Sequence, residues 1–202
     1  EKSGLKAEGW CYGIAVVDIN QDGYQDFYIC KSGNKNTPAL QRRNYFFINN
    51  GLSPSPNGEG RGEVTFTESA AKMGLDDDGY DVQAAFFDYD KDGDLDMYLM
   101  RNSFVSYNRN NAREMKSDME TSSTTDKLFR NDGPVVSLPS GGRKGGFTDV
   151  SKEAGITIEG FGLGVAVCDI NKDNWPDVYV SNDFITSDLV WINNHDGTFS
   201  NK

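Results

Sequence analysis

Carboxylate and amide side chains recur at a fixed spacing in three short stretches of this chain. They occupy the first, third, fifth and ninth positions of residues 18–26, 88–96 and 169–177. These side chains are Asp18, Asn20, Asp22 and Asp26, then Asp88, Asp90, Asp92 and Asp96, then Asp169, Asn171, Asp173 and Asp177. Ca²⁺ takes about six to eight oxygen ligands, and such a loop supplies most of them. The spacing therefore predicts three calcium sites.

The other positions of these loops fit the same chemistry. The seventh residue can add its backbone carbonyl to the ligand set; the seventh residues are Tyr24, Asp94 and Trp175. The sixth residue must allow a sharp turn; the sixth residues are Gly23, Gly93 and Asn174, types that tolerate a positive φ. The second loop carries four carboxylates at its ligand positions and the other two carry three each. We expect the second loop to bind calcium most tightly.

Two related metal sites fit less well. An EF-hand needs a bidentate glutamate at the twelfth position, where this chain has Ile29, Leu99 and Val180. Magnesium prefers a small octahedral shell that retains several waters. Ten unpaired carboxylates within three loops would repel one another, and bound calcium would offset that repulsion. Calcium is therefore the predicted cofactor, at three sites.

The elements around the loops recur as well. A short apolar strand precedes each loop and another follows it; these are residues 13–17 and 27–30, 84–87 and 97–100, and 164–168 and 178–180. A third strand begins at Tyr45, Lys127 or Leu189, and a fourth contains Phe66, Phe147 or Phe199. Each loop is thus a hairpin connection. Four strands per repeat are typical of a propeller blade.

The sequence therefore predicts an all-β fold, namely a β-propeller fragment of three four-stranded blades with calcium-binding hairpin loops. The expected blades are residues 11–70, 80–151 and 161–202, and residues 1–10 are interpreted as the tail of a preceding repeat. Three blades cannot close a ring. Residues 1–202 are thus expected to form a single partial propeller whose remaining blades belong to a longer parent protein.

Composition limits the class of protein. The 202 residues include 22 glycines and carry a formal net charge of −11, which would repel a phosphate backbone and argues against nucleic acid as a partner.

The single histidine, His195, is interpreted as a turn residue. Cys168 lies in an apolar run and is predicted to be buried. Free thiols are favoured for Cys11 and Cys30, and a disulfide between them stays open as an alternative.

The loops, together with residues 13–26, 84–96 and 161–177, resemble the FG-GAP and VCBS repeats of integrin-like propellers. The resemblance covers nearly the whole chain. It implies a calcium-stabilised propeller outside the cytoplasm, whether extracellular, at the cell surface or periplasmic, that recognises a protein or glycan in adhesion. The long insertions, above all residues 104–125, depart from the family pattern and leave the ligand open.

A non-catalytic binding module is the favoured function. A purely structural spacer beside another functional domain fits the same sequence, and part of a propeller-based enzyme acting on glycans is the alternative. The insertion at residues 104–125 is the expected recognition element, with Tyr107, Arg109 and Arg113 as candidate ligand contacts. An enzyme would need acidic or Tyr/Arg/His side chains free of metal duty, and the candidates for that role are few. Because the inner strands are apolar on both faces, self-association is a further expected property.

Overall fold

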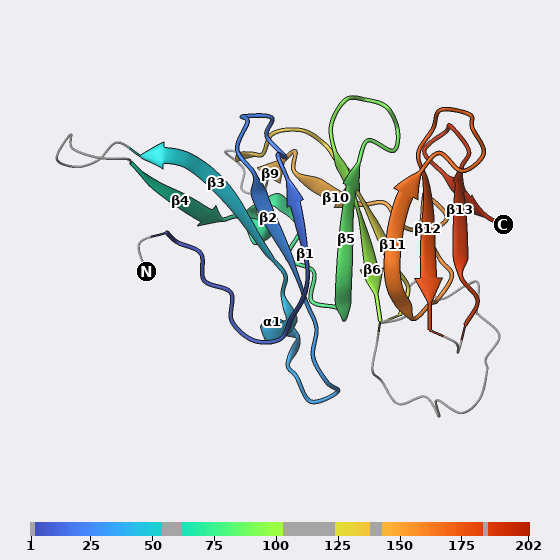
Figure 1. Cartoon of the computed structure of the whole chain (residues 1–202), viewed down its shortest axis with the longest axis horizontal. Coiled ribbons are helices and arrows are strands. Elements are labelled where there is room, and N and C mark those ends of the chain that lie inside the picture. The colour runs from blue at the N-terminus through green and yellow to red at the C-terminus, as the bar shows by residue number, and fades with distance from the viewer. Residues whose placement is uncertain (1–2, 54–61, 103–123, 138–142, 184–185) are drawn as a thin grey trace.

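The computed structural model describes residues 3–53, 62–102, 124–137, 143–183 and 186–202. It is all-β and consists of three antiparallel four-stranded sheets that stand side by side, with the two chain ends at opposite ends of the row (Figure 1). The prediction of an all-β fold with four strands in each repeat is confirmed at this level. Among the described residues, no helix is long and apolar enough to cross a membrane.

Each sheet is a simple meander, in which every strand pairs with the next along the chain apart from one insertion. The first sheet contains β1 (Cys11–Val17), β2 (Asp26–Lys31), β3 (Tyr45–Ser53) and β4 (Glu63–Glu68). The second contains β5 (Asp81–Phe87), β6 (Asp96–Arg101), β7 (Lys127–Asn131) and β10 (Phe147–Asp149). The third contains β11 (Gly162–Cys168), β12 (Asp177–Asn182), β13 (Leu189–Asn193) and β14 (Phe199–Asn201).

The remaining elements are short and lie between strands. Two single-turn helices, α1 (Ala39–Arg42) and α2 (Ala70–Met73), follow β2 and β4. The strands β8 (Val136–Ser137) and β9 (Arg143–Lys144) pair with each other inside the insertion between β7 and β10. These elements have no signal in the sequence, because each is too short to show a hydrophobic period.

Apolar side chains on alternate strand positions form two cores, one at each junction between sheets. The core between the first and second sheets includes Tyr28, Cys30, Phe46, Met97, Leu99 and Phe129. The core between the second and third includes Tyr98, Met100, Leu128, Val178, Val180 and Trp191. The second sheet thus contributes to both cores: Met97 and Leu99 of β6 point to one neighbour, and Tyr98 and Met100 to the other. This arrangement explains why all six residues of β6 are buried.

The outward faces of the two end sheets are apolar but uncovered. In β1, Ile14 is 64% and Val16 57% exposed, whereas Val17 points into the core. At the other end of the row, Val165 and Val167 of β11 pack against the second sheet, and Leu163 is exposed. The faces of these strands are therefore not equivalent, because only one of them meets a neighbouring sheet.

The cysteines follow the same division of faces. Cys168 is exposed, so the prediction that it is buried is wrong: it alternates with Val165 and Val167 and falls on the uncovered face of β11. Cys30 is buried in the core between the first two sheets, whereas Cys11 is exposed and lies opposite Lys31 in the strand pairing. All three thiols are free, and Cys11 and Cys30 form no disulfide.

A polar side chain just before the third strand joins that strand to the second in every sheet. Asn44 accepts a hydrogen bond from Lys31 N at 2.7 Å, and Asp126 accepts one from Arg101 N at 2.8 Å. In the third sheet, Asp188 accepts one from Asn182 N at 2.8 Å. Each of the three also bonds a tyrosine hydroxyl of the second strand; these tyrosines are Tyr28, Tyr98 and Tyr179. The bond compensates the burial of Tyr28 and Tyr98.

Replacing Asp126 with Asn is expected to flatten the dependence of stability on pH. Burial, opposed by the bonds from Arg101 and Tyr98, raises the pKa of Asp126 to about 7. In the unfolded chain the pKa is about 3.9. The stability that this group contributes is therefore full below about pH 4 and is lost as the pH rises towards 7.

Asparagine, which the first sheet has in the same place as Asn44, carries no proton to lose. The metal-free variant should be more stable than the wild type at pH 8 and should change less between pH 4 and 7. Urea unfolding across that range measures both quantities. An unchanged slope with a lower stability at pH 8 would contradict the expectation.

A buried ion network connects the strands at the junction of the first two sheets. Arg101 is paired with Asp77 and, at 3.0 Å, with Asp81, while Lys127 Nζ lies 2.6 Å from Asp77. Asn44 Nδ2 of the first sheet donates to Asp81 at 2.7 Å. Burial alone would raise the pKa of Asp77, but Arg101 and Lys127 outweigh it and lower the pKa to about 2. Asp77 is therefore ionised at neutral pH.

Candidate metal centre

The three acidic loops connect the first and second strands of the sheets and lie along the same edge of the molecule, at the top of Figure 1. The aspartate at the first position organises each loop in the same way. One oxygen accepts a bond from the amide of the fifth residue, and the other from the amide of the sixth. For Asp18 these distances are 3.0 Å to Asp22 N and 2.8 Å to Gly23 N. The equivalent bonds of Asp88 and Asp169 are 2.9 to 3.1 Å long.

The carboxylate at the fifth position closes the far side of the loop. It accepts a hydrogen bond from the amide of the seventh residue, which is Tyr24, Asp94 or Trp175, at 2.8 to 2.9 Å. The backbone carbonyls of these seventh residues, and not their side chains, are the ligands that the sequence analysis predicts. Since the seventh residues differ in type while the turn is the same, the loop geometry depends on the backbone at this position.

The aspartate at the ninth position is completely buried and fixes the loop to the sheet. In the second loop, Asp96 accepts bonds from Tyr89 N at 3.1 Å and from Asn131 N of β7 at 2.8 Å. Asp26 and Asp177 make the equivalent bonds, which include those from Asn49 N at 2.7 Å and Asn193 N at 2.9 Å. Each loop is therefore completed by an amide of the third strand, a contact that sequence spacing alone did not indicate.

The turn requires positive φ at two positions. The sixth residue has φ values of 87° and 97° in Gly23 and Gly93, and of 69° in Asn174. Asparagine therefore replaces glycine there as the sequence analysis expected. The fourth residue is also left-handed, with φ of 56° for Gln21, 62° for Lys91 and 65° for Lys172. Lysine and glutamine have no special tolerance for this conformation, so the sequence offered no signal for it.

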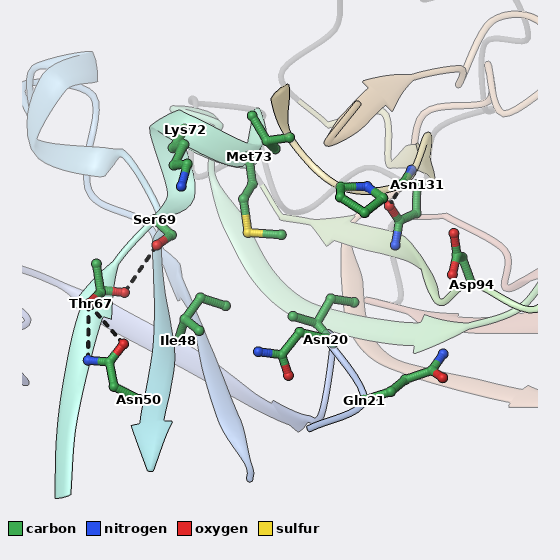
Figure 2. Close-up of a pocket in the computed structure, with 14 residues that line it drawn as sticks. Asn20, Gln21, Ile48, Asn50, Thr67, Ser69, Lys72, Met73, Asp94 and Asn131 are labelled. Carbon is green, nitrogen blue, oxygen red and sulfur yellow. Dashed lines mark hydrogen bonds between the residues drawn. The ribbon is translucent and has the colours of Figure 1, made fainter. Parts of the chain in front are cut away.

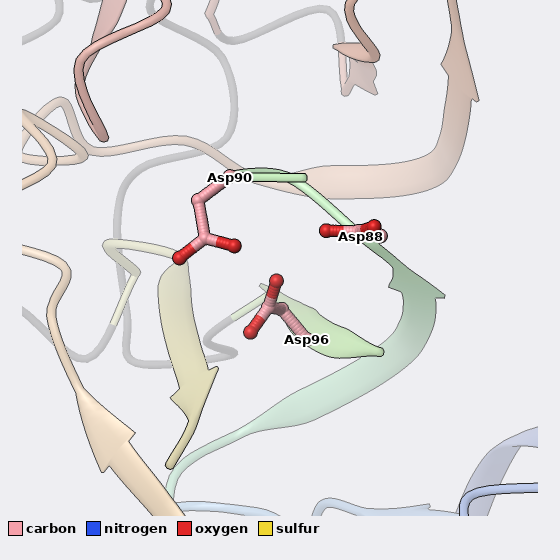
Figure 3. Close-up of side chains that lie close together, drawn as sticks. All are labelled: Asp88, Asp90 and Asp96. Carbon is pink, nitrogen blue, oxygen red and sulfur yellow. The ribbon is translucent and has the colours of Figure 1, made fainter. Parts of the chain in front are cut away.

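The second loop differs from the others in the arrangement of its carboxylates. In the first and third loops an amide at the third position donates to the carboxylate at the fifth; the bonds are Asn20 to Asp22 at 2.9 Å and Asn171 to Asp173 at 2.6 Å. The second loop has Asp90 at the third position. Its carboxylate oxygen lies within 4.8 Å of oxygens of Asp88 and Asp96, and the three converge in Figure 3.

Among the described residues, this is the one group of three acidic, histidine or cysteine side chains that come so close together. Burial raises the pKa of Asp96 to about 7, and burial together with repulsion from Asp92 raises the pKa of Asp90. These shifts show that the metal-free cluster resists full ionisation. A divalent cation would remove the repulsion, and an all-oxygen ligand set suits Mg²⁺, Ca²⁺ or Mn²⁺. The residues present therefore fit a hard cation in the second loop.

His195 has a second contact beyond its turn. It adopts a φ of 66° between β13 and β14, in agreement with its interpretation as a turn residue. Its Nε2 also lies 2.8 Å from Asp173 Oδ2 of the third loop, and its ring stacks on Trp175 with centroids 4.7 Å apart. This contact has no local signal in the sequence, because 22 residues separate His195 from Asp173.

A cavity of about 540 Å³ opens between the first two loops (Figure 2). Asn20 and Asp94 of the two loops lie on its wall, and Ile48 and Met73 provide apolar surface, with the Met73 side chain extending towards the middle. Several of its polar groups are already bonded within the protein: Asn50, for example, bonds Thr67 at 3.1 Å. The cavity therefore combines an apolar interior with a rim of satisfied amides.

The candidate ligand contacts Tyr107, Arg109 and Arg113 lie outside the described residues, as does most of the insertion at residues 104–125. The fifteen predicted metal-site residues lie within them and form three loops of one geometry, of which the second gathers its carboxylates most closely. No model of a known protein family matches the chain, and no curated protein matches it either.

Proposed function

We propose that this chain is a calcium-binding segment of an extracellular β-propeller that serves in protein or carbohydrate binding. The three sheets are its blades, and the loops after β1, β5 and β11 are its calcium sites. The observation that carries the proposal is the cluster of Asp88, Asp90 and Asp96, formed in a loop whose hydrogen bonds are repeated in two others. The resemblance of the loops to FG-GAP and VCBS repeats supports the same proposal.

Calcium is favoured over magnesium because these loops offer many protein oxygens. Side chains at four positions and a backbone carbonyl at a fifth approach the six to eight ligands, roughly, that calcium takes. Magnesium usually keeps several waters and one or two carboxylates. Loops that bind calcium with low affinity are filled at the calcium concentration found outside cells, which supports an extracellular, cell-surface or periplasmic location.

A protein or glycan ligand would bind either to the surface beside the calcium loops or to the insertion at residues 104–125. The cavity between the first two loops offers Ile48 and Met73 to an apolar group and Asp94 to a cation. Two acidic side chains lining another cavity, of about 350 Å³, are already engaged: Asp126 accepts from Tyr98 and Arg101, and Asp149 is paired with Lys127 at 3.1 Å. Binding is therefore the function that we propose for this chain.

Isothermal titration with CaCl₂ after removal of metal tests the proposal. The wild type is expected to bind three ions, and Asp92→Ala to bind two, because it lacks one carboxylate of the second loop. Asp132→Ala is the matched control, since Asp132 is acidic but pairs with Arg130 outside the loops. Heat of binding that is absent in the wild type, or equal in MgCl₂ and CaCl₂, would contradict a calcium-specific function.

A further inference from the structure

The second and third loops are connected by two sets of contacts. Lys91, the fourth residue of the second loop, places its Nζ 4.5 Å from the centroid of the Trp175 ring, in the third loop. The same ring stacks on His195 at 4.7 Å with an interplanar angle of 16°, and His195 reaches the Asp173 carboxylate at 2.8 Å. A continuous series of contacts therefore runs from the second loop to a predicted metal ligand of the third.

The second set of contacts is buried. Asn193 Nδ2 donates to the carbonyl of Tyr89 in the second loop at 2.8 Å and to that of Pro176 in the third loop at 3.3 Å. Its backbone amide also donates to Asp177. In the other sheets the equivalent Asn49 and Asn131 bond the eighth-position carbonyl of their own loops, at 3.2 Å each. Between the first and second loops, the contact that corresponds to that of Lys91 comes from Gln21, the fourth residue of the first loop. Its Nε2 donates to Gly93 O of the second loop at 3.4 Å.

The fourth residue of every loop has a positive φ, and in the first two loops its side chain reaches the next loop. A positive φ at Gln21 and Lys91 accompanies a side chain that reaches the following loop in both cases. Holding a non-glycine residue in this conformation costs free energy and is maintained by its surroundings. At Lys91 the side chain lies over Trp175, the aromatic type that binds a cation best.

We propose that Lys91 is a positioning residue for the third loop, so that binding of calcium in the second loop strengthens its binding in the third. This inference rests on the proposed calcium function and adds a coupling between two of its sites. Ordering the second loop fixes Lys91 and the Tyr89 carbonyl, which in turn hold Trp175, His195 and the Asp173 carboxylate. Since such coupling is reciprocal, calcium in the third loop strengthens the second by the same factor.

The charge of Lys91 makes the proposal testable against simple electrostatics. Removing a cation from the neighbourhood of two calcium loops should strengthen calcium binding if charge alone decides. A positioning role predicts the opposite for the third loop. Lys172, which has the same type and position in the third loop, is a matched control, because Lys172→Ala removes the same charge.

Calcium titrations followed by ¹⁵N NMR resolve the loops individually. The amides of Gly23, Gly93 and Asn174 each donate to the first aspartate of their own loop and report on it. Lys91→Ala is expected to weaken binding at Asn174 by about two- to fivefold, the range of an exposed cation–π contact. Lys91→Arg should restore it, and Lys172→Ala should leave it unchanged or stronger.

Loss of the second site provides an independent measurement. Asp90→Ala should abolish the response of Gly93 and weaken that of Asn174 by about fivefold, at the lower end of ordinary coupling. In EDTA, Lys91→Ala should also speed hydrogen exchange of the Trp175 amide, with the Tyr24 amide unaffected. The coupling is overturned if Lys91→Ala strengthens the third loop as Lys172→Ala does. If Asn174 in the wild type does not respond to calcium, the proposed calcium function of that loop fails as well.

Discussion

Replacing Arg101 with Ala is expected to lower the free energy of unfolding by about 3 to 5 kcal/mol, because it leaves the buried Asp81 carboxylate without its cation, whereas Asp77 keeps Lys127. Arg101 is 8% exposed and contacts both Asp77 and Asp81. Asp81 is completely buried and also accepts from Asn44 of the first sheet. The loss should therefore loosen the junction between the first and second sheets. Urea unfolding of both proteins at neutral pH measures the difference.

Arg43→Ala is the control for this experiment. Arg43 pairs with Asp76 at 3.2 Å, but its side chain is half exposed, so its removal should cost less than about 1 kcal/mol. The double variant Arg101→Met, Asp81→Asn should be more stable than Arg101→Ala, because it removes the Asp81 charge together with the Arg101 cation. Equal losses in Arg101→Ala and Arg43→Ala would show that the buried network contributes no more than a surface pair.

Calcium is expected to raise the melting temperature of the metal-free protein by roughly 5 to 10 °C for each site that it fills. Ligand at about a hundred times its dissociation constant stabilises a folded protein by about 2.7 kcal/mol per site. In a chain of this size each kcal/mol corresponds to about 2 to 4 °C. The second loop should account for the largest share, because its three converging carboxylates repel one another until a cation binds. Thermal unfolding in EDTA and in about 1 to 10 mM CaCl₂ measures the shift.

Asp90→Asn separates calcium binding from general salt effects. It introduces at the third position of the second loop the amide that the first and third loops already have. The metal-free variant should be at least as stable as the wild type, since one repelling charge is gone, whereas its gain on adding calcium should be smaller. A calcium response unaffected by Asp90→Asn, or reproduced by NaCl of the same ionic strength, would contradict a site at this cluster.

The strands and the loops could be predicted from the sequence because their signals are local. Alternating apolar residues on each side of a repeated acidic turn specify a hairpin, and the third copy, with Asn174 in place of glycine, still obeys the requirement for positive φ. Three repeats in register strengthen that interpretation. The four strands of each sheet and the positions of the three loops therefore follow from short-range patterns alone.

The errors and omissions concern contacts between residues far apart in the chain. Cys168 and Cys30 both stand in apolar strands, but only Cys30 faces a neighbouring sheet, and sequence does not say which face that is. His195 and Asp173 meet because two turns of the third sheet lie side by side. Lys91 contacts Trp175 of another loop across 84 residues of chain, and its residue type indicates neither that contact nor the positive φ of its turn.

The hydrogen bond from the third strand to the last aspartate of each loop has a consequence for minimal peptides. Asn49 N, Asn131 N and Asn193 N supply this bond from 16 to 35 residues beyond the aspartates they contact. A synthetic nine-residue peptide would contain every predicted ligand but would leave that carboxylate free to turn away. We therefore expect such a peptide to bind calcium far more weakly than the folded chain. Grafting the site onto another protein would require a host hairpin whose adjacent strand places a backbone amide within hydrogen-bond distance of the ninth-position aspartate.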